Sequence, residues 1–532
     1  MKRAVLLFII FICIYNSKAQ NKYWISFSDK SGVSFDPYSY FNERAIQQRI
    51  ENNISLFDST DFPINSFYLS KIFENSDSVS WSSRWLNGIA VFTTPEKLKT
   101  ISGFPFVKEI YPMNTEAIPS SNSDNTISKI STKDLALLHF QTQRMQGDSF
   151  IVHNLDGTGI RIAVFDVGFP DVDKNPAFAH LRAEKKIVAT YDFIKHTDNV
   201  YKSHWHGTAT LSCIGGKIDS INIGLATGAE FFLARTEKLV SEVYSEEENW
   251  LAAAEWADRL GVNIISSSLG YTNRRYFNSQ MDGRTSLVSR AATIAASKGI
   301  LVINAAGNEG GDSWHTIDTP ADADSVLTVG GTDPATDLHI YFSSFGPTSD
   351  GRLKPNVCAV ANVIAARSKG LSEVAGTSFS APLVAGFAAC AWQSNRKWSN
   401  MDLFNAIEKS AHLYPYFDYA HGFGIPQAGR ILLEEKIIEP TFDFVIINND
   451  IKIILREKYS YPDEEVQLGF NARRNFYYKV EDKDGKMKNY SVLLADRKEM
   501  LHVFAEDFKP GDVLSVHFEG YTNTLDFPQE IK

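Results

Sequence analysis

The stretch Gly376-Thr377-Ser378-Phe379-Ser380-Ala381-Pro382 decides how this chain folds. This loop of small residues leads into an apolar stretch, Leu383–Trp392, which has helix-forming residues and no charged side chain. Because no polar stripe interrupts that stretch, it predicts a helix that is buried on most of its faces. Pro382 is expected in the first turn of this helix, where a missing backbone N–H costs little.

On this prediction Ser378 lies at a helix N-terminus, where unpaired backbone N–H groups and the positive end of the helix dipole favour negative charge. A nucleophilic serine needs this placement, because acyl transfer develops negative charge on an oxygen about 3 Å from such donors. Taken alone, however, the stretch fits an ordinary helix cap better, since Ser and Thr are common caps. The remaining chain decides between the two interpretations.

Length and composition describe a globular chain of several domains. At 532 residues the chain is longer than one ordinary domain, and roughly three are expected from length alone. Its 44% of hydrophobic residues is enough for sizeable buried cores. The formal net charge of −10 argues against nucleic acid as the main partner.

The N-terminus predicts export. Lys2 and Arg3 precede a short apolar run, Ala4–Tyr15, and small residues follow at the positions expected before a cut after Ala19. This pattern is typical of a secretory signal peptide, here residues 1–19. The run is too short for a comfortable membrane span, and no other long apolar run exists. We therefore expect a mature chain without a membrane span that is secreted, periplasmic or bound at the cell surface.

Three cysteines remain after this cut, namely Cys213, Cys358 and Cys390. An odd number in an exported chain leaves at least one thiol unpaired, so a disulfide scaffold is excluded. All three lie in apolar contexts, which favours small buried hydrophobic residues over catalytic or metal-binding ones.

The pattern of the sequence divides the mature chain into three blocks and a linker. Residues 20–115 alternate strand and helix signals, which predicts a small α+β domain, with a helix that Thr94 caps and Pro95 begins. A polar linker follows over residues 116–139. Residues 140–434 repeat buried strands and helices, which predicts an α/β fold with a parallel sheet covered by helices on both faces. Residues 435–532 contain short strand-like runs between turns, among them Glu465–Phe470 and, as the last, Val513–Phe518, which predicts an all-β sandwich or barrel.

A serine that performs acyl transfer needs a base and a carboxylate that orients it. Asp166 directly follows the first buried strand of the α/β block, Ile160–Phe165, where the site of a parallel sheet is expected. His206 opens the sequence His-Gly-Thr-Ala, in which the small residues let a substrate approach the backbone. His204 is a rival base, but no Gly-Thr follows it, and we do not favour it.

With these segments in view, the chain resembles the subtilisin-type serine endopeptidases, the subtilases. The order Asp166, His206, Ser378 is the order of that family and differs from other triad folds. The resemblance covers roughly residues 155–430. Three further stretches of it are Ser267-Ser268-Leu269-Gly270, Ala305-Ala306-Gly307-Asn308-Glu309-Gly310, and Phe342-Ser343-Ser344-Phe345-Gly346-Pro347 followed by Asp350-Gly351-Arg352 and Lys354-Pro355.

The resemblance implies a role for each candidate residue. Ser378 attacks the scissile carbonyl, His206 takes and returns the proton, and Asp166 holds the imidazole. The Asn308 side chain and the Ser378 N–H bind the oxyanion. Ser268, Leu269 and Gly270 form the strand that pairs with an extended peptide substrate.

The resemblance also gives the first block an interpretation. Subtilases are often exported with a small ferredoxin-like prodomain that assists folding and plugs the cleft, and residues 20–115 have a suitable size and position. The chain's own prodomain is thus an expected partner, beside protein or peptide substrates.

No cofactor is expected for the chemistry, although calcium is frequent in the family. Asp171-Val172-Asp173-Lys174-Asn175 resembles the start of a calcium loop, but Pro176 stands where Gly is needed and Arg182 where the final Glu belongs. We therefore reject this site and identify no metal ligands.

Some positions depart from the family's usual pattern. Val167 replaces a Thr or Ser after the aspartate, Ala209 stands in place of a second His, and Asn356 in place of Asp. Cys358-Ala359-Val360-Ala361 replaces the usual Ala-Pro-Gly ending and leaves the shape of that loop open. None of these changes removes a group that the chemistry needs.

Three functions compete on this evidence. The favoured one is an active secreted endopeptidase made as a zymogen. The others are a degenerate subtilase that serves as a binding module, and a peptidase specialised for one partner that the β domain docks. The run Glu246-Glu247-Glu248 is interpreted as solvated helix surface rather than as a selector for basic substrates.

Overall fold

The structure is a computed structural model that describes residues 21–113, 131–238, 245–272, 275–367, 370–433, 438–459 and 474–527. The predicted signal peptide lies outside these residues, as does most of the predicted linker. The described chain divides into two compact units. The first holds the residues up to Phe35 and from Ser59 to Met113, and the second holds Asp36–Asp58 and everything from residue 131 onward.

The smaller unit is a four-stranded antiparallel sheet with two helices. Its strands and helices follow in the order βαββαβ, and the strand order across the sheet is β2-β3-β1-β4, which is the ferredoxin-like arrangement. Thr94 caps the second helix and Pro95 begins it, as the sequence predicts. The elements are β1 (Asn21–Phe27), α3 (Ser66–Asn75), β2 (Ser78–Ser83), β3 (Gly88–Thr93), α4 (Pro95–Ser102) and β4 (Val107–Met113).

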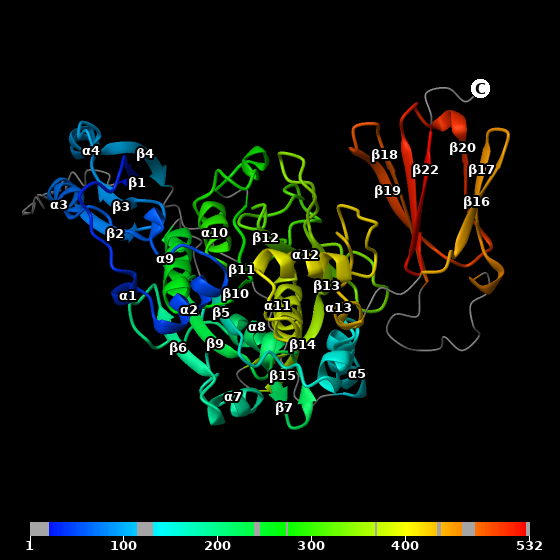
Figure 1. The fold of residues 1–532 in the computed structure, drawn as a ribbon, viewed down its shortest axis with the longest axis horizontal. Helices are drawn as coiled ribbons and strands as arrows, with labels where there is room; N and C mark the ends of the chain where they lie inside the picture. The colour runs from blue at the N-terminus through cyan, green and yellow to red at the C-terminus, as the bar shows by residue number, and fades with distance from the viewer. Residues whose placement is uncertain are drawn as a thin grey trace, which may run out of the picture. The chain divides into compact units, whose positions relative to one another are not determined.

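Two helices that lie between β1 and α3 in the sequence belong to the larger unit instead. They are α1 (Pro37–Tyr40), which Asp36 caps, and α2 (Glu43–Glu51), which Asn42 caps. Figure 1 shows the blue helix α2 beside the green helix α9. The block that was predicted as one α+β domain is therefore divided in its packing, although it is continuous in sequence.

The larger unit is built on a parallel sheet of seven strands in the order β13-β12-β11-β10-β5-β9-β6. These strands are buried on both faces, which explains their nearly continuous apolar sequence. They are β5 (Arg161–Asp166), β6 (Ile187–Asp192), β9 (Glu230–Arg235), β10 (Ile264–Ser267), β11 (Leu301–Ala305), β12 (Val326–Thr332) and β13 (Val357–Val360).

Two pairs of helices cover the two faces of this sheet (Figure 1). On one face α8 (His206–Gly215) packs against α11 (Thr377–Ser394), and on the other α9 (Ser245–Arg259) packs against α10 (Leu287–Ser297). Both pairs also contact the strands, so the predicted α/β fold with a doubly covered parallel sheet is confirmed. Smaller elements complete this part: α5 (Thr132–Gln143), α6 (Gly147–Val152), α7 (Ala179–Ala183), β7 (Lys217–Ile218), β8 (Ile221–Asn222), β14 (Asn362–Arg367), β15 (Gly370–Ala375), α12 (Asn400–Ser410) and α13 (Ala428–Leu432). Helix α5 begins inside the segment 116–139 that was predicted as a linker.

Helix α11 is the buried helix that the opening stretch predicts, since every residue from Thr377 to Trp392 is buried. The prediction for Pro382 is wrong, however. The helix begins at Thr377, directly after Gly376, whose φ of 147° favours glycine. Pro382 therefore lies in the second turn, and its missing N–H leaves the carbonyl oxygen of Ser378 without a helical partner.

The C-terminal block forms two antiparallel sheets that share one core. Side chains from both sheets meet in a single apolar cluster, so the block is a β-sandwich. One sheet contains β16 (Phe442–Ile447), β17 (Asp450–Leu455) and β20 (Glu499–Phe504); the other contains β18 (Asn475–Glu481), β19 (Met487–Leu494), β21 (Val513–Phe518) and β22 (Tyr521–Asp526). The predicted strand at Glu465–Phe470 lies outside the described residues, and β22 was not predicted. Among the described residues, no helix combines the length and apolarity needed to cross a membrane.

Candidate active site

The candidate residues lie where the parallel strands end. Asp166 is the last residue of β5, and Asn308 follows β11. His206 is the first residue of α8 and Ser378 the second residue of α11, the two helices that pack together on one face of the sheet. The candidate residues thus lie at the carboxyl ends of parallel strands and at the N-termini of helices. This is the expected place for a site in this class of fold.

Asp166 and His206 form a buried hydrogen-bonded pair. The Nδ1 atom of His206 lies 2.9 Å from Oδ1 and 3.0 Å from Oδ2 of Asp166, whose side chain is fully buried. Burial by itself lowers the pKa of His206, but the charge and the hydrogen bond of the Asp166 carboxylate outweigh it and raise this pKa above its usual value. The carboxylate occupies Nδ1, which leaves Nε2 as the nitrogen that can exchange a proton with a substrate or a nucleophile.

Two further donors hold the Asp166 carboxylate. The backbone N–H of Val167 donates to Oδ1 at 2.8 Å, and the buried Thr210 hydroxyl lies 3.0 Å from Oδ2. The same hydroxyl lies 3.1 Å from the Gly207 carbonyl oxygen, but a bond to a charged carboxylate is the stronger of the two. The hydroxyl that Val167 lacks is therefore supplied from one turn along α8.

The approach of α8 to Asp166 requires glycine at two positions. A Cβ atom on Gly207 would lie 2.2 Å from the Gly168 carbonyl oxygen and 3.0 Å from Cβ of Asp166. Gly168 itself has a φ of 135°, and a Cβ there would lie 2.2 Å from the Lys202 carbonyl oxygen. Small residues beside the aspartate and the histidine are thus needed for the pair to form.

Ser378 is tied to Ser268 by two hydrogen bonds. The Ser268 hydroxyl donates to the Ser378 carbonyl oxygen at 2.7 Å, and the Ser378 hydroxyl donates to the Ser268 carbonyl oxygen at a long 3.4 Å. The first bond replaces the helical bond that Pro382 cannot make. A side chain at the end of β10 thus fixes the backbone of the candidate nucleophile.

The histidine lies against the same turn of α11, since its ring centroid is 5.3 Å from that of Phe379. Within the described residues, the Ser378 hydroxyl bonds to Ser268 and makes no hydrogen bond to His206. In structures without substrate such a bond is often long or absent and forms in the complex, so this geometry does not exclude a catalytic pair.

Asn308 is held by the residue that precedes the serine. Its Oδ1 atom accepts from the Thr377 N–H at 2.9 Å, and the Thr377 hydroxyl lies 3.0 Å from this Oδ1 and 3.0 Å from the Gly307 carbonyl oxygen. With Oδ1 occupied, the Nδ2 hydrogens are the part of the amide that remains to donate, and the residue is exposed. The bond from the Thr377 N–H therefore fixes the direction in which the Asn308 amide faces.

The segment Ser268-Leu269-Gly270 continues from β10 beyond its last paired residue. The Asn304 side chain donates to the Leu269 carbonyl oxygen at 2.9 Å, and a Cβ atom on Gly270 would lie 2.5 Å from the Asp318 carboxylate. These contacts fix the segment's backbone. Of its three residues, the structure brings Ser268 into direct contact with Ser378.

Sequence reasoning missed two parts of this site. Thr210 lies four residues after His206 on the same helix, and that spacing is the signal that could have placed it beside the pair. The bond between Ser268 and Ser378 joins residues 110 positions apart, and no local pattern in the sequence marks it.

The expectation for Glu246-Glu247-Glu248 is wrong, because all three side chains are buried in the first turn of α9. Arg275 pairs with Glu246 at 2.9 Å and with Glu247 at 3.3 Å, and the Tyr276 hydroxyl donates to Glu247. Burial raises the pKa of Glu247 in spite of these partners. The run is therefore an internal ion cluster, which a count of charges along the chain cannot distinguish from a solvated face.

The loop that resembles a calcium site is held by a side-chain cation. The Arg182 guanidinium donates to the carbonyl oxygens of Val172 and Asn175 at 2.8 Å each, and Lys174 pairs with Asp171 at 2.9 Å. Elsewhere in the described part of the chain, no group of three or more His, Cys, Asp and Glu residues is arranged to hold a metal ion.

The departures from the family's pattern have structural roles. Asn356 accepts from the Lys354 ammonium at 2.9 Å and donates to Glu408 at 2.8 Å, and burial lowers the pKa of Lys354 to about 7. Cys358 lies in the buried strand β13. The three cysteines are buried, as predicted, and all three are free, where the sequence predicted at least one free thiol. Burial raises the pKa of the Cys213 thiol to about 12.

Comparison with known proteins identifies the same region. The model of the Subtilase family matches residues 157–424, about half of the chain, and the model of the Peptidase S8 propeptide domain of Bacteroidota matches residues 22–129.

Similar curated proteins are bacterial proteases. Alkaline elastase YaB of Bacillus sp. (strain YaB) is 27% identical over 48% of this chain and 60% of its own length. Subtilisin BL of Lederbergia lenta is 26% identical over 50% of this chain and 89% of its own length. A solved structure of a cold adapted subtilisin-like serine proteinase is 22% identical, covers 52% of this chain and 89% of its own, and has a TM-score of 0.42. The chain thus spans about 60% of the elastase. Since the family model covers half of its residues, this chain belongs to the subtilase family.

Proposed function

We propose that this protein is an exported serine endopeptidase, made as a zymogen, that hydrolyses peptide bonds through an acyl-enzyme on Ser378. One observation carries the proposal: a buried carboxylate occupies Nδ1 of a histidine that lies against the N-terminal turn carrying Ser378. This arrangement supplies an oriented base beside a serine at a helix N-terminus. Membership in the subtilase family supports the same reaction.

In the proposed reaction, Ser378 Oγ attacks the scissile carbonyl carbon while Nε2 of His206 takes the hydroxyl proton. The carbonyl oxygen becomes an oxyanion, which accepts from the Ser378 N–H and from Nδ2 of Asn308. His206 then gives its proton to the leaving amine, and the carbon–nitrogen bond breaks. Water, deprotonated by His206, attacks the ester and releases the second product with the serine hydroxyl restored.

Asp166 keeps His206 in the tautomer that has its hydrogen on Nδ1 and stabilises the imidazolium that forms in each step. Val167 N–H and Thr210 keep that carboxylate in place. The chain supplies the nucleophile, the base and the oxyanion donors, so the proposed reaction requires no cofactor.

The proposed substrates are protein chains bound in extended form along Ser268-Leu269-Gly270. The signal-peptide pattern at residues 1–19 supports export, and the match to a propeptide model supports synthesis as a zymogen. In this proposal the propeptide is the chain's own inhibitor until it is cut off.

The test compares purified wild type with Ser378→Ala. Wild type is expected to lose its propeptide and to cleave unrelated denatured proteins, whereas the variant remains full-length and inactive. A wild type that processes itself but cleaves no unrelated protein would indicate a peptidase for one partner. A folded wild type with neither activity would favour the binding-module function and overturn the proposal.

A further inference from the structure

The propeptide contains a segment that packs with the peptidase domain rather than with its own sheet. This segment is Asp36–Asp58, here called the propeptide arm, and it carries α1 and α2. It lies inside the matched propeptide, residues 22–129, yet belongs to the compact unit that holds the peptidase fold. The contacts of the arm explain this assignment.

The arm caps the end of α9. The Asn42 N–H donates to the Arg259 carbonyl oxygen at 3.0 Å, and its side chain donates to the Leu260 carbonyl oxygen at 2.9 Å. These carbonyls belong to the C-terminal turn of the helix, where internal partners run out. A Cβ atom on Gly261 would lie 2.7 Å from the backbone nitrogen of Ala45, so the two backbones are in close contact.

Two ion pairs join the arm to the peptidase domain. Arg49 lies 2.6 Å from Asp258, and the two side chains are 2% and 5% exposed, so this pair is removed from water. The Arg49 guanidinium also lies 4.1 Å from the ring of Phe41, which covers it. Asp58 pairs with Lys298 at 2.9 Å; the Lys298 side chain is 1% exposed, but that of Asp58 is 37% exposed, so water reaches this second pair. The buried Arg49–Asp258 pair is the costly one to break, because two charges that are removed from water would be separated.

The surface that the arm covers lies at the edge of the sheet opposite to the candidate active site. Residues 258–263 lead into the amino end of β10, Lys298 precedes the amino end of β11, and Arg44 donates to the Gly159 carbonyl oxygen just before β5. Asp166 and Ser268, in contrast, are at the carboxyl ends of these strands. The arm therefore cannot act by blocking the catalytic serine.

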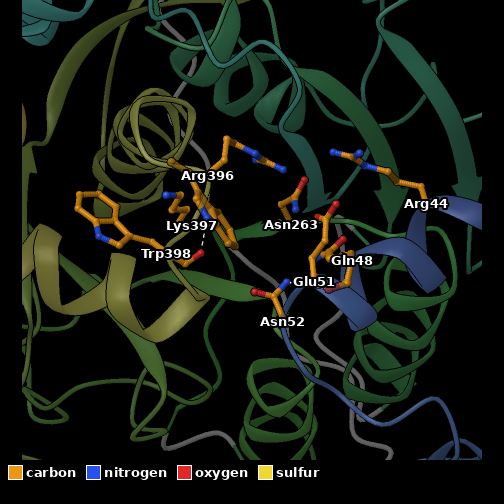
Figure 2. Close-up of a pocket in the computed structure, with 9 residues that line it drawn as sticks. Arg44, Gln48, Glu51, Asn52, Asn263, Arg396, Lys397 and Trp398 are labelled. Carbon is orange, nitrogen blue, oxygen red and sulfur yellow. Dashed lines mark hydrogen bonds between the residues drawn. The ribbon is translucent and has the colours of Figure 1, made fainter.

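The interface is polar and incompletely packed, as Figure 2 shows. A cavity of about 580 Å³ separates arm residues from the segment after α11. Arg44 and Arg396 line it, and burial together with the Arg44 charge lowers the pKa of Arg396. The other lining residues are Gln48, Glu51, Asn52, Asn263, Trp392, Lys397 and Trp398. The lining of the cavity is mostly charged or polar, which is more typical of a transient interface than of a permanent one.

We propose that the propeptide arm is a binding element that holds the propeptide on the peptidase domain from the edge opposite to the active site. A cut between propeptide and peptidase domain then does not release the propeptide by itself, because the hydrogen bonds and ion pairs of the arm must also be broken. The proposal extends the proposed zymogen, but the contacts themselves do not depend on catalysis.

The test therefore separates release from activity. The full chain carries Ser378→Ala, a site for an unrelated sequence-specific protease within residues 114–130, and an N-terminal tag ahead of residue 21 by which it is immobilised. After the protease has cut, the loss of the peptidase domain from the surface is followed over time. Since this chain cannot cut itself, a failure of the proposed catalysis leaves the measurement valid.

Arg49→Ala is expected to speed release roughly 30- to 5000-fold, the range for removal of one partner of a buried interfacial pair. Asn42→Ala, which keeps that pair, should speed release by at least roughly 2- to 10-fold, because it removes the bond to Leu260 and also the N-cap of α2. The matched control is Gln47→Ala, an exposed position on the same helix, which should release at the rate of the parent chain.

Charge exchange gives a further check, because Arg49→Asp should speed release and Asp258→Arg in the same chain should slow it again. If Arg49→Ala does not fold, Asn42→Ala and Asp58→Asn decide the question alone. Release rates within twofold of the Gln47→Ala control for all arm variants that fold would overturn the proposal.

Discussion

The bond from the Ser268 hydroxyl to the Ser378 carbonyl oxygen offers a sharp test of how the candidate nucleophile is positioned. The bond is 2.7 Å long and joins two buried residues. Ser268→Ala removes the donor, and Pro382 cannot replace it with a backbone N–H. A buried carbonyl oxygen left without a partner costs about 1–3 kcal/mol, so we expect the free energy of unfolding to fall by that amount.

Pro382→Ala restores the missing N–H four residues after Ser378. In that background the carbonyl oxygen keeps a helical partner, and Ser268→Ala should cost less than in the parent chain. The two changes should therefore be coupled by at least about 1 kcal/mol, well above the roughly 0.5 kcal/mol within which independent changes add. The double-mutant cycle also cancels the loss of the proline ring, which occurs on both sides.

Unfolding by urea is best measured on chains that carry Ser378→Ala, since this change keeps the carbonyl oxygen and prevents self-digestion. With Ser378 intact, Ser268→Ala should lower kcat by roughly 10- to 100-fold, because small misplacements of a reacting group are costly. Strictly additive free energies in the cycle would refute the account of the Pro382 position, even if each single variant were less stable.

Three further predictions concern the groups around the serine. Thr210→Val should lower kcat/KM roughly 10-fold, because the Asp166 carboxylate loses one hydrogen-bond donor. Thr210→Ser keeps the hydroxyl and should retain most of the wild-type activity. Equal kcat/KM for wild type and both variants would show that the hydroxyl does not matter. The proposed reaction requires neutral His206, and the pKa of this residue is raised. We therefore expect kcat/KM to fall as the pH decreases through a midpoint above about 6.5, and Asp166→Asn should lower that midpoint. A midpoint that Asp166→Asn does not move would contradict this prediction. Asn308→Ala should lower kcat by roughly 10²–10³-fold with little change in KM, which is the effect known for the oxyanion-hole asparagine of a subtilisin. A change confined to KM would count against an oxyanion role for Asn308.

Much of the fold follows from local patterns. Strands buried on both faces leave nearly continuous apolar runs, so the parallel sheet is visible in the sequence, and Asp166 is placed at a strand end by the same rule. The all-β character of the last block follows from short strand-like runs between turn residues, although the sequence left open whether it is a sandwich or a barrel. The cap at Thr94 follows from a cap residue directly before a proline.

What could not be predicted depends on contacts between distant segments. Pro382 was expected in the first turn of its helix, where no carbonyl oxygen would lose a partner. The sequence does not show that the Ser268 hydroxyl, 110 positions before Ser378, donates to the Ser378 carbonyl oxygen that Pro382 leaves without a helical bond. Glu246–Glu248 looked like solvated surface, because Arg275 reaches them from another loop. The propeptide arm has the same strand and helix pattern as its neighbours in the sequence. Its binding to the C-terminal end of α9 depends on contacts that this pattern does not show.

The central claim, that Ser378 is a nucleophile activated by His206, is tested most directly by covalent labelling. Purified wild type is treated with a fluorophosphonate probe, and the intact mass and the labelled peptide are determined beside those of Ser378→Ala and His206→Ala. The account predicts a single label on Ser378, absent from Ser378→Ala and strongly reduced in His206→Ala. A folded wild type that takes no label, or that is labelled on another serine, would contradict it.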